Sequence, residues 1–200
     1  MNRRRSTDRD QAVSAAKSDP ERALRLARQV SDPWYRAQAL AWVARFGPAG
    51  SVQELALESM RAAREGSDPY QRLAGLAWPV RMLAERGMRD HACSIVTEAL
   101  AELRSVDPPS SRSEAAYLLF QAAFDVSSEL REQLASLLVE IASSDTYWRT
   151  HRNVVDAISM LRPVAPALAA SLAAGIPSPK LQGRIARQAQ RQPRCSSGDP

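Results

Sequence analysis

The sequence predicts an all-α fold, an α-solenoid of about four antiparallel helix-pair repeats with capping helices. The first observation is a recurring Asp-Pro pair, because a period of about 20 to 50 residues is typical of stacked helical units. The second is the likeness of two stretches set 36 residues apart, SDPWYRAQALAWVARFG and SDPYQRLAGLAWPVRMLAERG. The third is that no stretch alternates β-branched and polar residues, so no sheet is expected. The Asp-Pro pairs are Asp19-Pro20, Asp32-Pro33, Asp68-Pro69 and Asp107-Pro108.

Each Asp-Pro pair is interpreted as the start of a helix. Asp accepts hydrogen bonds from the free amides of a first helical turn, and Pro suits the first helical position because it lacks an N–H. Asp145 opens a fourth copy although Thr146 stands where Pro would be. Alignment on the Asp places an arginine four residues later and an aromatic residue ten residues later in the best copies. The arginines are Arg36, Arg72 and Arg149, with Arg112 one residue late, and the aromatic residues are Trp42, Trp78 and Tyr117.

A second helix follows a turn in each unit. Its apolar residues recur at helical spacing, which favours a hairpin of two helices. The fourth unit is degenerate, because Pro163 and Pro166 interrupt it and ALAASLAAG leaves only a short second helix. The expected second helices of the first three units are SVQELALESMRAAREG, MRDHACSIVTEALAELRSV and SSELREQLASLLVEIASS.

Two features of the first helices have structural interpretations. The repeated arginine is expected to pair with the capping Asp or to reach the end of the preceding helix. Pro79 lies inside the first helix of the second unit, where it must free the carbonyl of Gly75. We expect a kink at this place.

Charge is distributed unevenly along the chain. Residues 1–9 carry a formal charge of +3 and residues 177–200 carry +4, so the remainder is −2 in a chain whose net charge is +5. The sequence divides into a disordered basic N-terminal tail (1–9), a helical repeat domain (10–176), a basic capping helix (177–192) and a disordered tail (193–200). An N-terminal helical segment is expected from Asp8 to Val30.

The basic C-terminal segment has two interpretations. Arg184, Arg187 and Arg191 fall on one face of the expected helix, and apolar residues such as Leu181 and Ile185 fall on another. The first interpretation is a capping helix, because a terminal repeat needs a polar outer face. The alternative is that the three arginines contact a nucleic acid or an acidic partner. The mildly acidic repeat domain does not favour nucleic-acid binding along its length.

No segment of the sequence indicates export or membrane insertion. Arg3 to Arg5 are not followed by the apolar core of about 7 to 15 residues that a signal peptide needs. No apolar run approaches about 18 residues. Cys93 and Cys195 do not make a disulfide framework. We therefore expect a cytoplasmic protein with reduced thiols and with no cofactor, metal or membrane contact.

Catalytic residue patterns are scarce. His91 and His151, the two histidines, lack further ligands at metal-binding spacing, and Cys93 lies among apolar residues that favour an inert thiol. The eight glycines form no phosphate-binding loop. The sequence is therefore interpreted as that of a protein that is not an enzyme. The alternative, a helical-repeat enzyme, needs an acidic residue in a cleft between aromatic side chains, for which Asp125 and Asp156 are the candidates.

Aromatic and arginine residues stand out on the first helices. Several aromatic residues occupy the opening turns, while Trp42 and Trp78 share a column that Arg45 and Arg81 follow one turn later. Such residues dominate binding hot spots, so they are candidates to line a groove that holds a peptide. The alternative is that the aligned tryptophans pack between units as core. The candidate partner-binding residues are Trp34, Tyr35, Trp42, Arg45, Tyr70, Trp78, Arg81, Tyr147 and Arg149.

A family resemblance supports this interpretation. Over about residues 32–175, the Trp-containing first helix, its terminal glycine, a second helix such as HACSIVTEALAELRSVDP and the proline that opens the next unit resemble bacterial tetratricopeptide-type repeats. HEAT-like repeats are the alternative, because the tyrosine and glycine signature of the tetratricopeptide first helix is not met. Phrases such as DPWYRAQAL also resemble helical sensor arrays of large bacterial regulators. Either repeat family implies an α-solenoid scaffold whose inner face binds a protein or peptide.

The sequence therefore predicts a non-catalytic helical repeat scaffold that binds a protein or peptide partner. An extended or helical peptide is expected along the first-helix face, anchored by Trp34, Tyr35, Arg45, Tyr70 and Arg81. Nucleic-acid binding through the basic tails and a helical-repeat enzyme remain the alternatives.

Overall fold

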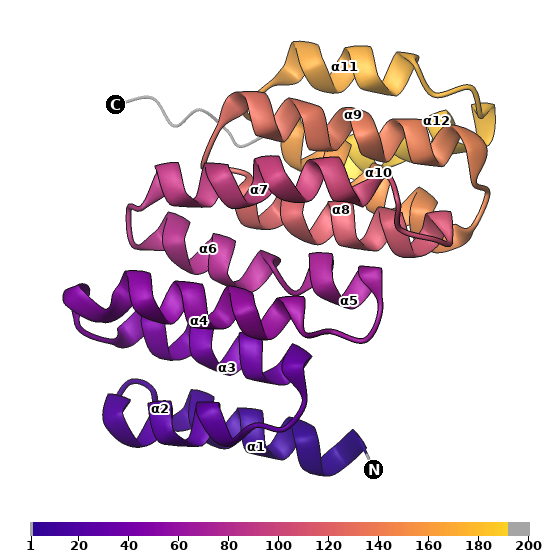
Figure 1. Ribbon diagram of the computed structural model, residues 1–200. Coiled ribbons are helices and arrows are strands. Elements are labelled where there is room, and N and C mark those ends of the chain that lie inside the picture. Colours follow the sequence, from indigo (N-terminus) through magenta and orange to yellow (C-terminus); the bar gives the residue numbers. More distant parts are fainter. Residues whose placement is uncertain (1, 192–200) are drawn as a thin grey trace, which may run out of the picture.

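The computed structural model describes residues 2–191 and, within them, the side chains of residues 7–189. Over these residues the secondary structure consists of twelve α-helices and one short 3-10 helix, without any β-strand (Figure 1). The predicted all-α fold class is confirmed. The tail predicted over residues 193–200, with Cys195, lies outside the described residues.

Short turns connect the helices. The first helices of the expected units correspond to α3, to α5 together with α6, to α8 and to α10, and the second helices correspond to α4, α7, α9 and α11. In chain order the elements are α1 (Asn2–Ala15), α2 (Pro20–Gln29), α3 (Pro33–Phe46), η1 (Ala49–Ser51), α4 (Val52–Arg64), α5 (Pro69–Ala74), α6 (Ala77–Glu85), α7 (Arg89–Leu103), α8 (Pro109–Ala123), α9 (Ser128–Ser144), α10 (Trp148–Leu161), α11 (Pro166–Ala174) and α12 (Pro179–Arg191).

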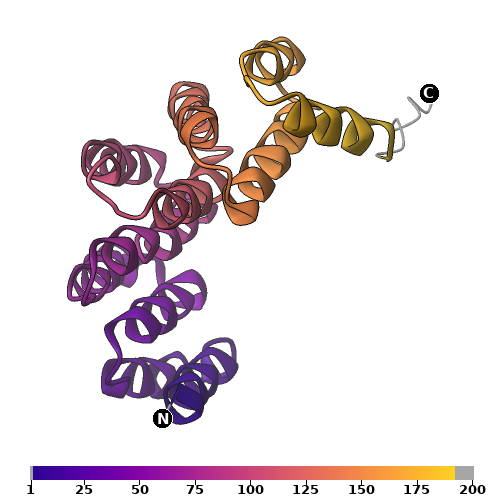
Figure 2. The same ribbon diagram turned by 90° about the vertical axis from the view of Figure 1, so that its right-hand side faces the viewer.

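The helices lie in two rows that follow the chain. One row holds α1, α3, α5 with α6, α8, α10 and α12, and in this row α1 contacts α3, α3 contacts α6, and so on to α12. The other row holds α2, α4, α7, α9 and α11, each packed on its neighbours along the sequence. Figure 2 shows the stack bent into an arc, with α7 and α9 on the outer side and α8 and α10 on the inner side. We call the two rows the inner row and the outer row.

Asp-Pro chemistry starts three helices, α2, α3 and α5, at the predicted places. The Asp19 carboxylate accepts a hydrogen bond from the Arg22 amide at 2.9 Å, and Asp32 accepts one from the Trp34 amide at 3.0 Å. Asp68 accepts a bond from the first turn of α5 at 2.9 Å. In all three helices a proline occupies the first turn, where no N–H is needed.

The third unit begins one residue later than its Asp-Pro pair predicts. Helix α8 starts at Pro109, the second of two consecutive prolines, so Asp107 is not its N-cap. A residue that precedes a proline is disfavoured in the helical conformation, which excludes Pro108 from the helix. Pro109 therefore takes the place of Pro33 and Pro69 in the other units. This shift accounts for the late position of Arg112 in the sequence alignment.

The repeated arginine has a structural role. In three successive units its guanidinium donates a hydrogen bond to a backbone carbonyl six residues earlier, at the end of the preceding helix. Val30 is the C-cap of α2, and Gly66 and Val106 lie in the turns just after α4 and α7. The arginine gives each of these carbonyls a hydrogen-bond donor. The predicted contact with the preceding helix end is confirmed. The bonds run from Arg36 Nη1 to the Val30 oxygen at 3.2 Å, from Arg72 Nη1 to the Gly66 oxygen at 3.2 Å and from Arg112 Nε to the Val106 oxygen at 2.9 Å.

Ion pairs connect successive helices of the outer row. At three junctions an arginine at the end of one outer helix contacts a glutamate on the next outer helix. The three arginines hold equivalent places in their units, so the periodicity of the sequence is repeated in the contacts. The pairs are Arg28 with Glu58 at 2.9 Å, Arg64 with Glu102 at 2.6 Å and Arg104 with Glu140 at 3.5 Å.

The first helix of the second unit is interrupted at the predicted place. It divides into α5 and α6, and Gly75 and Leu76 lie between them. A Cβ atom on Gly75 would lie 3.0 Å from the Cβ of Ala63 on α4 and 2.9 Å from the Gln71 oxygen. Gly75 therefore allows the close approach of α4, and Pro79 four residues later withholds the amide that would continue the helical bonding. The kink predicted here is confirmed.

The N-terminal region differs from the prediction. A disordered tail was expected over residues 1–9 and a single helical segment from Asp8 to Val30, but α1 begins at Asn2 and packs against α2 and α3. Ala12 and Ala16 are fully buried, and Arg9 Nη1 donates a bond of 2.9 Å to the buried Gln38 of α3. Tertiary contacts therefore hold this polar segment helical, and α1 with α2 adds a hairpin before the first expected unit.

Helix α12 covers α10, the helix before it in the inner row. Leu181 and Ile185 are buried, and α12 contacts α10. Arg162 of the turn after α10 donates a hydrogen bond of 2.9 Å to the Ile185 carbonyl. The residues that cover α10 therefore come from the same segment that carries the basic charge.

Candidate functional site

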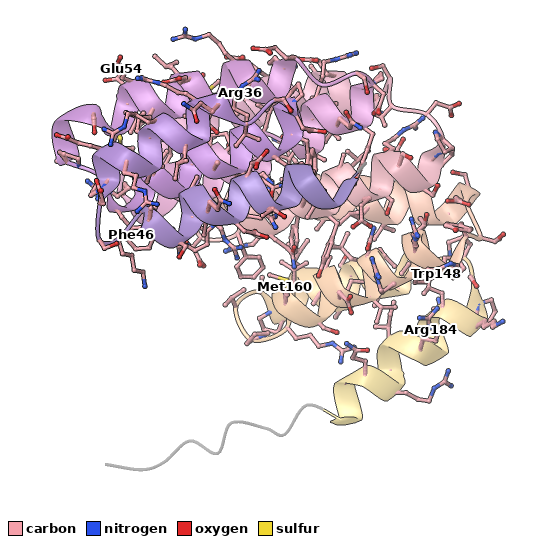
Figure 3. The ribbon with its side chains drawn as sticks, turned by 90° about the horizontal axis from the view of Figure 1, so that it is seen from below. Arg36, Phe46, Glu54, Trp148, Met160 and Arg184 are labelled. Carbon is pink, nitrogen blue, oxygen red and sulfur yellow. The ribbon has the colours of Figure 1, made fainter. Side chains whose placement is uncertain are left out.

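The candidate partner-binding residues lie on the inner row in two groups. The first group, in the opening turns, contains Trp34, Tyr35, Tyr70, Tyr147 and Arg149. The second group, further along α3 and α6, contains Trp42, Arg45, Trp78 and Arg81. Figure 3 shows Trp148 and Met160 at opposite ends of α10, with Phe46 of α3 toward the Met160 side. The two groups therefore lie toward opposite edges of the inner row.

The second group forms a shallow hollow between α3 and α6. Its volume is about 50 Å³, and it is lined by Ala41, Trp42, Arg45, Trp78, Arg81, Met82 and Glu85. The Trp42 ring stacks on Phe46 with centroids 5.6 Å apart, and the Arg45 guanidinium lies 4.7 Å from the Trp42 ring. Both tryptophans are half-buried. Trp78 combines the core and the groove interpretations, because it contacts the core and lines the hollow.

The Glu85 carboxylate contacts both predicted arginines, Arg45 and Arg81. Its Oε1 lies 2.5 Å from Arg45 Nη2 and 4.0 Å from Arg81 Nε. Arg45 is therefore held by Glu85 and by the Trp42 ring. Arg81 keeps 58% of its side chain exposed and has only this long contact with a carboxylate in the described part of the chain. Of these two arginines, Arg81 is the one that remains accessible to a partner.

A second hollow continues the first toward α8. It has a volume of about 270 Å³ and is lined by Arg81, Ala84, Glu85, Arg89, Gln121, Ala122 and Asp125. Arg81 and Glu85 line both hollows, so the hollows adjoin and make a depression that runs from α3 across α6 to α8 and the first residue of α7. We call this depression the arginine groove. Sequence reasoning did not assign Glu85 or Arg89 to the site, and it considered Asp125 only as a catalytic candidate.

Trp34 and Tyr35 of the opening-turn group contact other parts of the chain. The Trp34 ring stacks on Tyr70 of α5 with centroids 6.1 Å apart and an interplanar angle of 25°. The Arg9 guanidinium of α1 lies 5.4 Å from the Tyr35 ring. These rings are half-buried and connect successive inner-row helices, so part of their role is structural.

The start of α10 presents the most exposed aromatic side chains of this group. Trp148 is 53% exposed and Tyr147 is 45% exposed. The guanidinium groups of Arg149 and Arg152 lie 5.4 Å and 5.3 Å from the Trp148 ring. Arg152 also pairs with Glu114 of α8 at 3.4 Å, whereas Arg149 has no ion pair among the described residues. Tyr147 and Arg149 are thus accessible, with Trp148 as an additional exposed aromatic residue.

Two inner-row tyrosines have raised pKa values. Burial raises the pKa of Tyr70, and the negative charges of Glu114 and Asp68 raise it further, while Arg149 opposes them. Burial also raises the pKa of Tyr117, followed by the charge of Asp156. Both phenols therefore stay neutral at physiological pH and can donate hydrogen bonds.

The residues considered for catalysis are spread over the molecule. His91 of the outer row lies 3.3 Å from the Gln53 amide nitrogen, and Cys93 is a half-buried free thiol. Asp125 lies in the arginine groove, while Asp156 lies on α10 near Tyr117. The described residues contain no group of three His, Cys, Asp or Glu side chains placed to hold a metal ion.

The predicted polyanion contacts lie on α12. Arg184 is partly exposed, Arg187 is exposed, and neither forms an ion pair within the described residues (Figure 3 labels Arg184). The side chain of Arg191 lies outside the described residues. The exposed arginines and the buried Leu181 and Ile185 share the same helix.

Comparison of the chain with protein-family models, curated proteins and solved structures finds no match. In the part of the chain that the structure describes, no helix is both long enough and apolar enough to cross a lipid bilayer.

Proposed function

We propose that this protein is a non-catalytic α-solenoid that binds a protein or peptide on its inner row. The stacking of helix pairs in two rows supports a repeat architecture like that of tetratricopeptide or HEAT arrays, in which each pair covers its neighbour. The observation that carries the proposal is the arginine groove. Three successive units contribute to it, and four of the candidate residues from the sequence line it.

The composition of the groove is that of a binding surface. Tryptophan and arginine are enriched among residues that contribute most to binding, because they offer large contact area together with hydrogen bonds. Trp42 and Trp78 supply half-buried rings, and Arg81 supplies an exposed guanidinium. The exposed Tyr147 and Trp148 give a second place where a long partner would contact the inner row.

Site-specific photo-crosslinking tests the proposal. A photo-reactive residue at position 84, where the half-buried Ala84 lines the groove, is expected to capture a protein partner in a lysate of the native host. The matched control places the same residue at position 132, where Glu132 is exposed on the outer row. Capture at position 132 alone, or at neither position, would contradict the proposed binding face.

The nucleic-acid alternative has one observation in its favour, the absence of an ion pair for Arg184 and Arg187 within the described residues. Deleting residues 177–200 is a poor test, because it also removes the buried Leu181 and Ile185. The paired substitution Arg184→Gln and Arg187→Gln keeps the helix. A steep loss of RNA or DNA binding in this variant, together with strong salt dependence, would favour the alternative over the scaffold.

A further inference from the structure

Positive charge in the arginine groove exceeds negative charge. Arg45, Arg81 and Arg89 line it, against the carboxylates of Glu85 and Asp125. Glu85 is occupied by Arg45 at 2.5 Å, which leaves Arg81 with a contact of 4.0 Å. Arg89 is exposed and has no ion pair among the described residues, although Asp125 lines the same hollow. Carboxylates from outside can therefore reach Arg89, and also Arg81, whose contact with Glu85 is long and whose side chain is mostly exposed.

The surroundings of the groove add further positive charge. The Lys17 ammonium lies 5.1 Å from the ring of Phe46, and that ring stacks on Trp42 at the α3 end of the groove. Arg86 donates a hydrogen bond of 3.1 Å to the Arg45 carbonyl, which places one more guanidinium beside the end of α3. Cations near a helix C-terminus are also favoured by the negative end of its dipole.

One hollow on the outer row has the opposite charge. A hollow of about 630 Å³ between α7 and α9 is lined by Glu129, Glu132 and Glu140, with Arg104 as its one arginine. Arg104 is already paired with Glu140 at 3.5 Å. An acidic ligand is therefore attracted to the arginine groove and repelled from this outer-row hollow.

We infer that the partner of the arginine groove is an acidic peptide segment in which aliphatic side chains alternate with carboxylates. The inference rests on the proposed binding function and specifies its ligand. Aliphatic side chains contact Trp42 and Trp78, while the carboxylates pair with Arg81 and Arg89. An extended segment of about ten residues suffices to cross three helices, since each extended residue spans about 3.3 Å and helix axes lie about 8–10 Å apart.

Three sets of fluorescent peptides of about ten residues test the inference. Leucine and valine alternate with Asp and Glu in the first set, with Lys in the second and with Ser and Gln in the third. Binding to the full chain is measured by fluorescence anisotropy at about 0.01 M and about 0.15 M ionic strength. We expect the acidic set to bind best, with an affinity that falls as salt rises.

Two variants with opposite expected signs separate charge recognition from damage to the fold. Arg81→Gln with Arg89→Gln is expected to weaken binding of the acidic set by at least about fivefold. Asp125→Asn removes a repelling carboxylate and is expected to strengthen the same binding by up to about fivefold. Circular dichroism and thermal unfolding verify that both variants remain folded.

Each outcome decides one question. Binding of the acidic set with both expected changes supports the inference. Equal or stronger binding of the basic or neutral set overturns the acidic ligand but leaves a peptide-binding groove. Absence of binding by all three sets also overturns it, and the photo-crosslinking at position 84 then decides separately whether the groove binds any protein.

Discussion

Gly75 decides how closely two helices approach. The side chain of any other residue at this position would begin 3.0 Å from Ala63 Cβ and 2.9 Å from the Gln71 carbonyl. Both neighbours belong to packed helices, so the backbone must move to relieve the contact. At the residue scale, this glycine links the break between α5 and α6 to the packing of α4.

Gly75→Ala is therefore expected to destabilise the fold. Overpacking costs about 1–3 kcal/mol, which exceeds the roughly 1 kcal/mol that alanine gains in helix propensity. The expected net loss is up to about 2 kcal/mol in the free energy of unfolding, measured by urea denaturation. Gly50→Ala is the control, because no atom lies within 4 Å of a Cβ placed there. Equal stability of the two variants would contradict the close approach.

The two inner-row tyrosines make stability depend on pH in the alkaline range. Their pKa values are raised in the folded state, so an unfolded tyrosine loses its proton first, near its ordinary pKa of 10.0. The unfolded chain then binds fewer protons than the folded chain, and the free energy of unfolding falls as pH rises above about 10. Below about pH 10 the contribution of the two tyrosines to the free energy of unfolding is fully present.

The paired substitution Tyr70→Phe and Tyr117→Phe is expected to reduce this alkaline decline. Phenylalanine keeps the ring that stacks on Trp34 but removes the titrating hydroxyl. The check is urea denaturation at about pH 9 and about pH 11, compared with the exposed Tyr147→Phe as control. An unchanged decline in the double variant would show that other groups cause it.

At the scale of the element, the same contacts recur at successive helix junctions. Arginines at equivalent positions bond the end of the preceding helix, and a second set of arginines pairs with glutamates along the outer row. The first set bonds unpaired carbonyls and is partly buried. The second set is exposed, so each pair contributes little by itself.

The contribution of one such ion pair to stability can be measured at Arg64 and Glu102. A double-mutant cycle with Arg64→Gln and Glu102→Gln is expected to give a coupling energy of about 0.2–1 kcal/mol that decreases at about 1 M salt. Arg61→Gln on the same helix is the control, because Arg61 is exposed and has no ion pair in the described part of the chain. A coupling above about 2 kcal/mol would place the pair in a far less screened environment than its exposure indicates.

Local chemistry explains which elements the sequence predicts well. Asp32 and Asp68 start helices through contacts within the first turn, so their sequence pattern suffices. Helix α1 has no such pattern, because small residues such as Ala12 carry its burial and its polar residues find partners on α3. The candidate site likewise has one part that the sequence predicts and one part that depends on tertiary packing. The aligned Trp and Arg residues are visible in the sequence. Arg89 joins them through the turn from α6 to α7, and Asp125 joins them only through the packing of α6 against α8.

At the scale of the whole molecule, the helices contact mainly their neighbours along the stack. A chain built in this way loses stability locally when one end is weakened, because distant units share no contacts with it. Helix α12 offers the cleanest place to weaken, since Leu181 and Ile185 cover α10 and no later helix is described.

Leu181→Ala with Ile185→Ala is expected to raise hydrogen exchange in α10, α11 and α12 while leaving exchange in α1 to α4 nearly unchanged. Each substitution removes a buried side chain at a cost of about 2–5 kcal/mol, which exceeds what a single helix pair can absorb. Arg187→Gln is the control on the exposed face of the same helix. The measurement is amide exchange followed by mass spectrometry. A uniform increase across the chain would indicate one cooperative unit in place of a repeat array, and it would contradict the α-solenoid proposed for this protein.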